Sequence, residues 1–162
     1  MSRSTRCSTR AWAVDEIVRR YIGKPEFSNL PRKYKTAISG LQDVAHEVND
    51  VAFIGVNHPE HGPGLDLWVG GGLSTNPMLA QRLGAWVPLE EVPDVWEGVT
   101  SVFRDYGYRR LRSKARLKFL IKDWGMKNSA RFSNRNTWGA NSSTDPRLSR
   151  SSTRSTTSAC RS

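Results

Sequence analysis

Two β-rich runs separated by a short turn-rich segment constrain the fold of this chain most strongly. Residues 51–57 (VAFIGVN) and 65–71 (LDLWVGG) are dominated by apolar, β-branched and aromatic residues. The segment between them, HPEHGPG, contains two prolines and two glycines, which favour turns. Runs of this kind on either side of a turn pair as an antiparallel hairpin. The sequence therefore predicts a sheet with its hairpin tip at HPEHG. His58 and His61 lie at this tip, and a zinc site is not expected there because they have neither helical i, i+4 spacing nor a third ligand.

Helical patterns flank the hairpin on both sides. Residues 14–22 place their apolar side chains on one helical face, and residues 87–108 do so over the longest stretch of the chain. A further strand is expected to begin at residue 32. Strands and helices that occupy separate stretches of the sequence predict an α+β fold with a mixed or antiparallel sheet. The remaining expected elements are a strand over 32–39, a loop with a helical turn over 40–50, a short helix over 74–84, and a final helix over 113–125.

The charge of the chain is concentrated at its two ends. The formal net charge is +10 and the isoelectric point is about 10.2, values that normally suggest a nucleic-acid partner. Residues 1–12 carry +3 and residues 126–162 carry +6, which leaves only +1 for residues 13–125. The central part is nearly neutral, so the sequence argues against nucleic-acid binding.

We expect the two end segments to lie outside a single domain at residues 13–125. Segment 126–162 is rich in Ser, Thr and Arg and shows no apolar periodicity, which is typical of disorder. It is either a basic arm or the product of a shifted reading frame, and a two-base shift near Lys127 could restore the start of an amphipathic helix. Segment 1–12 is expected to be disordered or out of frame in the same way.

The positions of the cysteines and the lack of a long apolar run indicate the cellular compartment. Cys7 and Cys160, the two cysteines of the chain, lie in the end segments and form no metal-ligand motif. The sequence contains no run of about 18 apolar residues of the kind that spans a membrane. We expect a cytoplasmic protein with no membrane partner and no metal site built from its own side chains.

Two lysines stand close together in the stretch NLPRKYKTAIS. If residues 32–39 form a strand, Lys33 and Lys35 share one face, about 6–7 Å apart, and Arg32 and Tyr34 share the other. At an effective dielectric of about 20 the two ammonium groups repel by roughly 2–3 kcal/mol, and by less in water. The pair is either a solvated face or a site that holds an anion.

Two further features could carry chemistry. Three consecutive glycines, Gly70, Gly71 and Gly72, follow the second strand of the hairpin and either form a tight turn or let the backbone approach a flat or anionic ligand. The stretch 104–122 is strongly basic and contains two tyrosines. It predicts either a solvated helix face or a local pocket for a polyanionic cofactor, because arginine binds carboxylates in a bidentate manner.

Five segments in order resemble the ferredoxin-dependent assimilatory nitrite and sulfite reductases. They are NLPRKYKTAISG, HEVNDVAFIGV, DLWVGGGLSTNP, LGAWVPLEEVPDVWEGV and FRDYGYRRLRSKARLKFLI, and together they cover roughly residues 13–125. The resemblance implies a module of an enzyme that uses a sirohaem bridged to a 4Fe–4S cluster. It also implies ferredoxin as the electron donor and the reduction of nitrite to ammonia or of sulfite to sulfide.

The resemblance also implies roles for individual residues. The family motif Leu-Pro-Arg-Lys-Phe-Lys is matched at residues 30–35, with Tyr34 in place of phenylalanine. By this match Lys33 and Lys35 hold the anionic substrate beside the sirohaem and donate protons, so they are catalytic and cofactor-binding. Arg32 binds the carboxylates of the macrocycle, and we expect Gly70–Gly72 to lie against the cofactor.

The chain also departs from the family. The four cysteines that hold the cluster have no counterpart here, and only part of a fold with two related halves is represented. We therefore expect a truncated, frameshifted and monomeric fragment that cannot bind the cluster and is inactive alone. The alternative is a non-catalytic tetrapyrrole-binding module. The sequence does not distinguish nitrite from sulfite.

Overall fold

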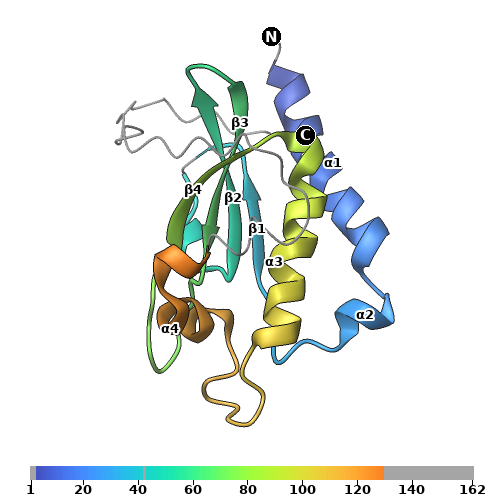
Figure 1. Ribbon diagram of the computed structural model, residues 1–162. Helices are drawn as coiled ribbons and strands as arrows, with labels where there is room; N and C mark the ends of the chain where they lie inside the picture. Colours follow the sequence, from blue (N-terminus) through green and yellow to red (C-terminus); the bar gives the residue numbers. More distant parts are fainter. Residues whose placement is uncertain (1–2, 42, 130–162) are drawn as a thin grey trace.

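A four-stranded mixed sheet with helices packed on one face makes up the fold (Figure 1). The computed structural model describes residues 3–41 and 43–129. The strands lie in the order β1-β2-β3-β4, with β1 parallel to β2 and the other neighbours antiparallel. The predicted α+β class is confirmed.

The elements are α1 (Arg3–Tyr21), α2 (Pro25–Ser28), β1 (Thr36–Ser39), η1 (His46–Val48), β2 (Val51–His58), β3 (Gly62–Val69), β4 (Gln81–Val87), η2 (Leu89–Glu91), α3 (Val92–Tyr106) and α4 (Leu117–Ser129).

The predicted hairpin is confirmed as β2 and β3. Val51 lies opposite Val69 at one end of the ladder, and His58 lies opposite Gly62 at the other. The strands extend further toward the tip than the sequence pattern indicated. At the tip the rings of His58 and His61 stack with 4.7 Å between their centroids, and Nδ1 of His58 accepts the backbone N–H of His61 at 3.2 Å. These histidines therefore serve the turn.

The core lies between the sheet and the helices α1 and α3. Alternation along the strands turns Phe53, Leu67 and Val69 toward the helices, where each is at most 4% exposed. Trp96 of α3 stacks on Tyr21 of α1 with 5.4 Å between the ring centroids. The stripe predicted from helical periodicity on α3 is buried throughout; it consists of Val92, Val95, Trp96, Val99, Val102 and Phe103.

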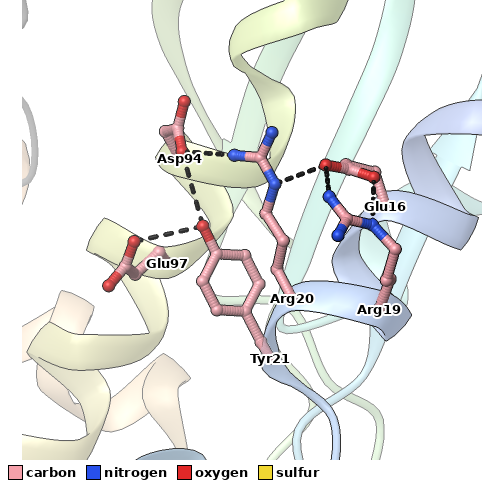
Figure 2. Close-up of polar contacts among 6 residues, drawn as sticks. All are labelled: Glu16, Arg19, Arg20, Tyr21, Asp94 and Glu97. Atoms are coloured by element: carbon pink, nitrogen blue, oxygen red, sulfur yellow. Dashed lines mark hydrogen bonds and ion pairs between the residues drawn. The ribbon is translucent and has the colours of Figure 1, made fainter.

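A chain of polar contacts also joins α1 to α3 (Figure 2). Arg20 contacts Glu16 of its own helix at 2.5 Å and Asp94 of α3 at 3.0 Å. The hydroxyl of Tyr21 donates to Glu97 of α3 at 3.1 Å. Arginine on one helix and carboxylates on the other thus fix the position of α1 beside α3.

The short helix predicted over residues 74–84 is wrong. Residues 81–87 form the edge strand β4, and Gly72 and Met78 form an isolated bridge that closes the loop between β3 and β4. The alternation was present in the sequence, since Leu83, Ala85 and Val87 face the core while Arg82 pairs with Asp66 on the other side of the sheet. The sequence favoured a helix here because Asn76 followed by Pro77 is typical of a helix start, but the pair lies in the loop between β3 and β4.

The strand predicted from residue 32 begins only at Thr36, which pairs with Val51. Upstream of it the backbone N–H of Lys35 donates to the side chain of Asp50 at 2.9 Å and not to a neighbouring strand. A side-chain carboxylate thus replaces the ladder at this point, so residues 32–35 are not part of the sheet.

The ends of the helices also differ from the prediction. α1 begins at Arg3, so most of segment 1–12, expected to be disordered or out of frame, continues the helix predicted over 14–22. The final helix was expected to end at Gly125, where the backbone of α4 leaves helical geometry with φ of 69° before it resumes as far as Ser129. Residues 130–162 lie outside the described residues, and the frameshift hypothesis stays a prediction. Within the described part, no helix has the length and apolar character needed to cross a membrane.

The contact between α1 and α3 predicts a pH window of stability. Hydrogen bonds from Arg19 and Arg20 lower the pKa of Glu16 to about 2, and burial together with the charge of Glu97 raises the pKa of Tyr21 to about 12. The Glu16 contribution is present above pH 4.5 and is lost as the pH falls toward 2. The Tyr21 contribution is present below pH 10 and is lost as the pH rises through about 12.

We expect the near-ultraviolet circular dichroism of the tryptophans to stay constant between these limits and to change beyond each one. The variant Glu16→Gln should weaken the acid limb, and Tyr21→Phe the alkaline limb. An acid transition that persists unchanged in Glu16→Gln would contradict the assignment.

Tyr34 provides a second test of the core. Its ring stacks on Phe103 with 5.6 Å between centroids, but its hydroxyl is buried without a hydrogen-bond partner among the described residues. Burial raises the pKa of Tyr34, and the nearby Thr100 hydroxyl, which donates to the Trp96 carbonyl at 2.7 Å, offsets this only in part.

We expect Tyr34→Phe to raise the free energy of unfolding by up to about 1 kcal/mol, because it removes an unsatisfied buried group. The matched control is Tyr108→Phe, which removes a hydroxyl that contacts Asp123 at 2.6 Å and should lower stability slightly. Urea unfolding of the two variants measures the difference, and a loss of stability in Tyr34→Phe would contradict this account.

Candidate functional site

A cavity with a cationic wall lies where the segment before β1 meets the start of α4. Its volume is about 320 Å³, at the small end of the range for ligand sites. Five of the side chains that line it are cationic, and two carry hydroxyl groups at the loop between β3 and β4. The lining residues are Arg32, Lys33, Ser74, Thr75, Arg112, Ser113, Arg116, Lys118 and Phe119.

A buried ion pair supports this wall from behind. The carboxylate of Asp50, which is fully buried, accepts from Nε and Nη2 of Arg116 at 2.9–3.1 Å. The same carboxylate accepts the backbone N–H of Lys35 at 2.9 Å. Burial raises the pKa of Asp50, and the Lys35 N–H and the Arg116 guanidinium oppose that effect. A guanidinium in contact with a carboxylate favours its ionised form, so the pair with Arg116 opposes the effect of burial on Asp50.

Lys118 fastens the loop between β3 and β4 to α4. It is only 2% exposed, and its ammonium group donates to the carbonyls of Gly72 at 3.2 Å and of Asn76 at 2.5 Å. Within the described residues no carboxylate lies within ion-pair distance of it. Burial and the neighbouring Arg116 lower the pKa of Lys118. The loop that carries Ser74 and Thr75 is therefore held in the cavity wall by a buried cation.

Arginines also join the segment before β1 to the loop that follows α3. Nη1 of Arg32 donates to the carbonyl of Arg112 at 2.9 Å. The guanidinium of Arg109 donates to the carbonyl of Asn29 at 2.7 Å and to its side-chain oxygen at 3.0 Å. These contacts bring two basic segments, about 80 residues apart in the sequence, to one side of the cavity.

The structure places the two predicted lysines differently with respect to the cavity, and their role in a site stays a prediction. Lys33 and Lys35 are exposed, while the ring of Tyr34 between them packs into the core. Lys33 lines the cavity, and Lys35 is not among the lining residues. The prediction that Arg32 shares a face with Tyr34 is wrong, because Arg32 lines the cavity beside Lys33. The backbone bends before it reaches β1, so strict alternation does not hold at Arg32.

The three glycines are accounted for by the protein itself. The N–H groups of Gly70, Gly71 and Gly72 donate to the carbonyls of Asp50, Asn49 and Met78 at 2.8–2.9 Å. A side chain at Gly71 would collide with the carbonyl oxygen of Glu47, and Gly70 has a φ of +84°. Their N–H groups are therefore used within the fold. That they lie against a cofactor stays a prediction.

Sequence reasoning missed several residues of the wall. Ser74, Thr75 and the supporting Asp50 were not singled out, and Arg116 and Lys118 were included only as part of a basic stretch. A signal for the last two was present, because they alternate with Ala115, Leu117 and Phe119 at the start of an otherwise apolar helix. Charged side chains that alternate with apolar ones at the start of a helix are expected to be buried, and a buried charged side chain needs a polar partner.

Comparison with known proteins agrees with this geometry. The sequence pattern of the nitrite and sulphite reductase 4Fe-4S domain matches residues 4–135 of the chain. The chain belongs to the nitrite and sulfite reductase family. The match includes the cavity, the two lysines and the three glycines, so the resemblance drawn from the five sequence segments is confirmed.

Individual members of the family show how much of the enzyme this chain represents. It is 89% identical to a sulfite reductase [ferredoxin] of Mycobacterium tuberculosis (strain H37Rv) over 115 residues, which cover 71% of this chain and 21% of that protein. It is 39% identical to a ferredoxin–nitrite reductase of Synechococcus elongatus over 116 residues, 69% of this chain and 22% of that protein. The chain spans about a fifth of the length of these relatives.

A solved structure confirms the fold of this part of the family. The structure of the Mycobacterium tuberculosis NirA protein matches with a TM-score of 0.72 and 86% sequence identity. The match covers 74% of this chain and 22% of that one. The mixed sheet and its helices therefore have the architecture of a reductase module.

Lys118 gives a direct test of how the cavity wall is built. Replacing it in Lys118→Met removes the ammonium donor from the carbonyl of Asn76 and leaves the carbonyl of Gly72 with only the N–H of Met78, and we expect a loss of about 1–3 kcal/mol in the free energy of unfolding. The amides of Gly72 and Met78, which close the loop by reciprocal hydrogen bonds, should exchange with solvent at least about tenfold faster.

The matched control is Lys114→Met, which replaces an exposed lysine in the turn before α4 and should change neither quantity. Unchanged amide exchange of Gly72 and Met78 in Lys118→Met would show that Lys118 does not hold the loop.

Proposed function

We propose that this chain is the part of a ferredoxin-dependent sulfite reductase that binds sirohaem carboxylates and holds the anionic substrate. The single observation that carries the proposal is the cavity, in which five cationic side chains from three segments face one another in a folded part of almost no net charge. Gathering like charges in this way costs electrostatic energy unless an anion binds there.

Sirohaem fits the residues that are present. Its many carboxylates suit a wall of guanidinium and ammonium groups, which form charge-assisted hydrogen bonds with carboxylates. A cavity of about 320 Å³ admits the acidic side chains of such a cofactor and not its whole ring, so the chain supplies one wall of the site. Arg32 and Arg112 are the groups in the best position to hold these carboxylates.

The 4Fe–4S cluster does not fit this chain. A cluster of this kind is held by four cysteine thiolates, and the sequence contains two cysteines, Cys7 and Cys160. Among the described residues no group of three or more potential metal ligands comes together. We propose that the cluster ligands belong to other parts of the enzyme, so this fragment is inactive alone.

Lys33 and Lys35 are assigned to the substrate. The bound sirohaem would supply the iron at which sulfite accepts electrons. Fixed cations beside that position stabilise the developing negative charge of the oxyanion, and a lysine ammonium can transfer a proton to a departing oxygen. Lys33 is placed for this role at the cavity, and Lys35 is two residues further along the same exposed side of the segment.

The relatives favour sulfite over nitrite as the substrate. The sulfite reductases from mycobacteria are 80–89% identical to this chain, whereas the nitrite reductases are 36–39% identical. We propose ferredoxin as the electron donor of the whole enzyme and the cytoplasm as its location, with the fragment monomeric. The second candidate, a non-catalytic tetrapyrrole-binding module, describes what the isolated chain would do, since it has the cationic cavity without the cluster ligands.

Titration with sirohaem tests the proposal. We expect the purified chain to shift the absorbance of sirohaem on binding, and sulfite to shift the spectrum of the loaded protein again. The variant Lys33→Met/Lys35→Met should bind sirohaem within about threefold of the original affinity, because the arginines of the wall remain, and should lose the second shift.

The control is Lys122→Met, which removes an exposed lysine from α4 and should change neither step. If the unaltered chain gives no absorbance shift, a tetrapyrrole role is contradicted. If the sulfite shift persists in the double variant, the role of the two lysines is contradicted.

A further inference from the structure

The cations of the cavity wall differ in what neutralises them. Lys118 and Arg32 donate to backbone carbonyls, which carry no net charge, so these contacts provide neither side chain with a counter-charge. Arg116 alone among the lining residues has a carboxylate partner within the described part of the chain. Its Nε and Nη2 groups are occupied by Asp50, and Nη1 has no hydrogen bond to any of the residues that the structure describes.

We propose that Asp50 is a positioning residue that withholds Arg116 from the anionic ligand and at the same time fixes the backbone of Lys35. The inference deepens the proposed function and rests on it, because it concerns the same cavity. Arg116 lines the site but, as half of a buried neutral pair, adds almost no attraction for an anion. The wall therefore binds its ligand through Arg32, Lys33, Arg112 and Lys118.

The position of Lys35 supports the second part of the proposal. Residues 32–35 precede β1, and the carbonyl of Lys35 accepts the N–H of Val51 at 3.1 Å where the pairing with β2 begins. The N–H of Lys35 would lack a partner without the Asp50 carboxylate, which accepts it at 2.9 Å. Asp50 immediately precedes β2, so a rigid strand positions the carboxylate for both contacts.

Two variants separate the charge of Asp50 from its hydrogen bond. Asp50→Asn keeps an oxygen that can accept from the Lys35 N–H but leaves Arg116 without its counter-charge. Asp50→Asn/Arg116→Met removes the whole pair while it keeps that oxygen. The probe is uroporphyrin, a metal-free porphyrin with eight carboxylates, whose fluorescence reports binding to the purified full-length chain.

We expect Asp50→Asn to bind uroporphyrin roughly three- to tenfold more tightly while its unfolding midpoint in urea falls, because Arg116 becomes an unpaired cation beside the cavity. The double variant Asp50→Asn/Arg116→Met should bind uroporphyrin with an affinity within about twofold of that of the unaltered chain. If the role of Asp50 were merely structural, Asp50→Asn would lower both the affinity for uroporphyrin and the stability of the chain. A higher affinity together with a lower stability therefore distinguishes the positioning role from a structural one.

The outcomes distinguish this inference from the proposed function. If the unaltered chain does not bind uroporphyrin, the proposed function fails and the inference fails with it. If the unaltered chain binds but the variant without the pair loses more than about tenfold in affinity, Arg116 binds the ligand directly and only the inference is overturned. Weaker binding by folded Asp50→Asn would also overturn it.

Discussion

The buried pair of Asp50 and Arg116 joins the three parts of the chain that build the cavity. Asp50 stands at the start of β2, Arg116 stands just before α4, and the backbone of Lys35 leads into β1. Breaking a buried pair by removing one partner typically costs about 3–5 kcal/mol, because the remaining charge stays buried. The contact thus lies where the parallel pairing of β1 with β2 begins and where the chain enters α4.

The cavity shows how a nearly neutral module forms a strongly cationic site. Most of the surplus charge belongs to the end segments, so the site gains its potential from the placement of a few residues and not from their number. Backbone carbonyls hold Arg32 and Lys118 without providing a counter-charge, and the carboxylate of Asp50, behind the wall, pairs with Arg116. The same contacts fix the loop that carries Ser74 and Thr75.

The features that could be predicted from the sequence are those that depend on local periodicity. The hairpin and the long helix follow from alternation and from apolar residues three or four apart, and the exposure of Lys33 and Lys35 on either side of a buried Tyr34 follows in the same way. β4 was missed because a local Asn-Pro signal was given more weight than the alternation of residues 81–87. The contacts of Asp50 with Arg116 and of Lys118 with the loop join residues 42–66 positions apart, which periodicity cannot reveal.

The most direct test of the central claim is the hydrogen exchange of the Lys35 amide, measured residue by residue on the intact chain. If the Asp50 carboxylate fixes this segment, the Lys35 amide should be protected to the same degree as the Val51 amide, which donates back to the Lys35 carbonyl. A Lys35 amide that exchanges at the rate of an unfolded peptide while Val51 remains protected would show that Asp50 does not hold the segment, and the account would be wrong.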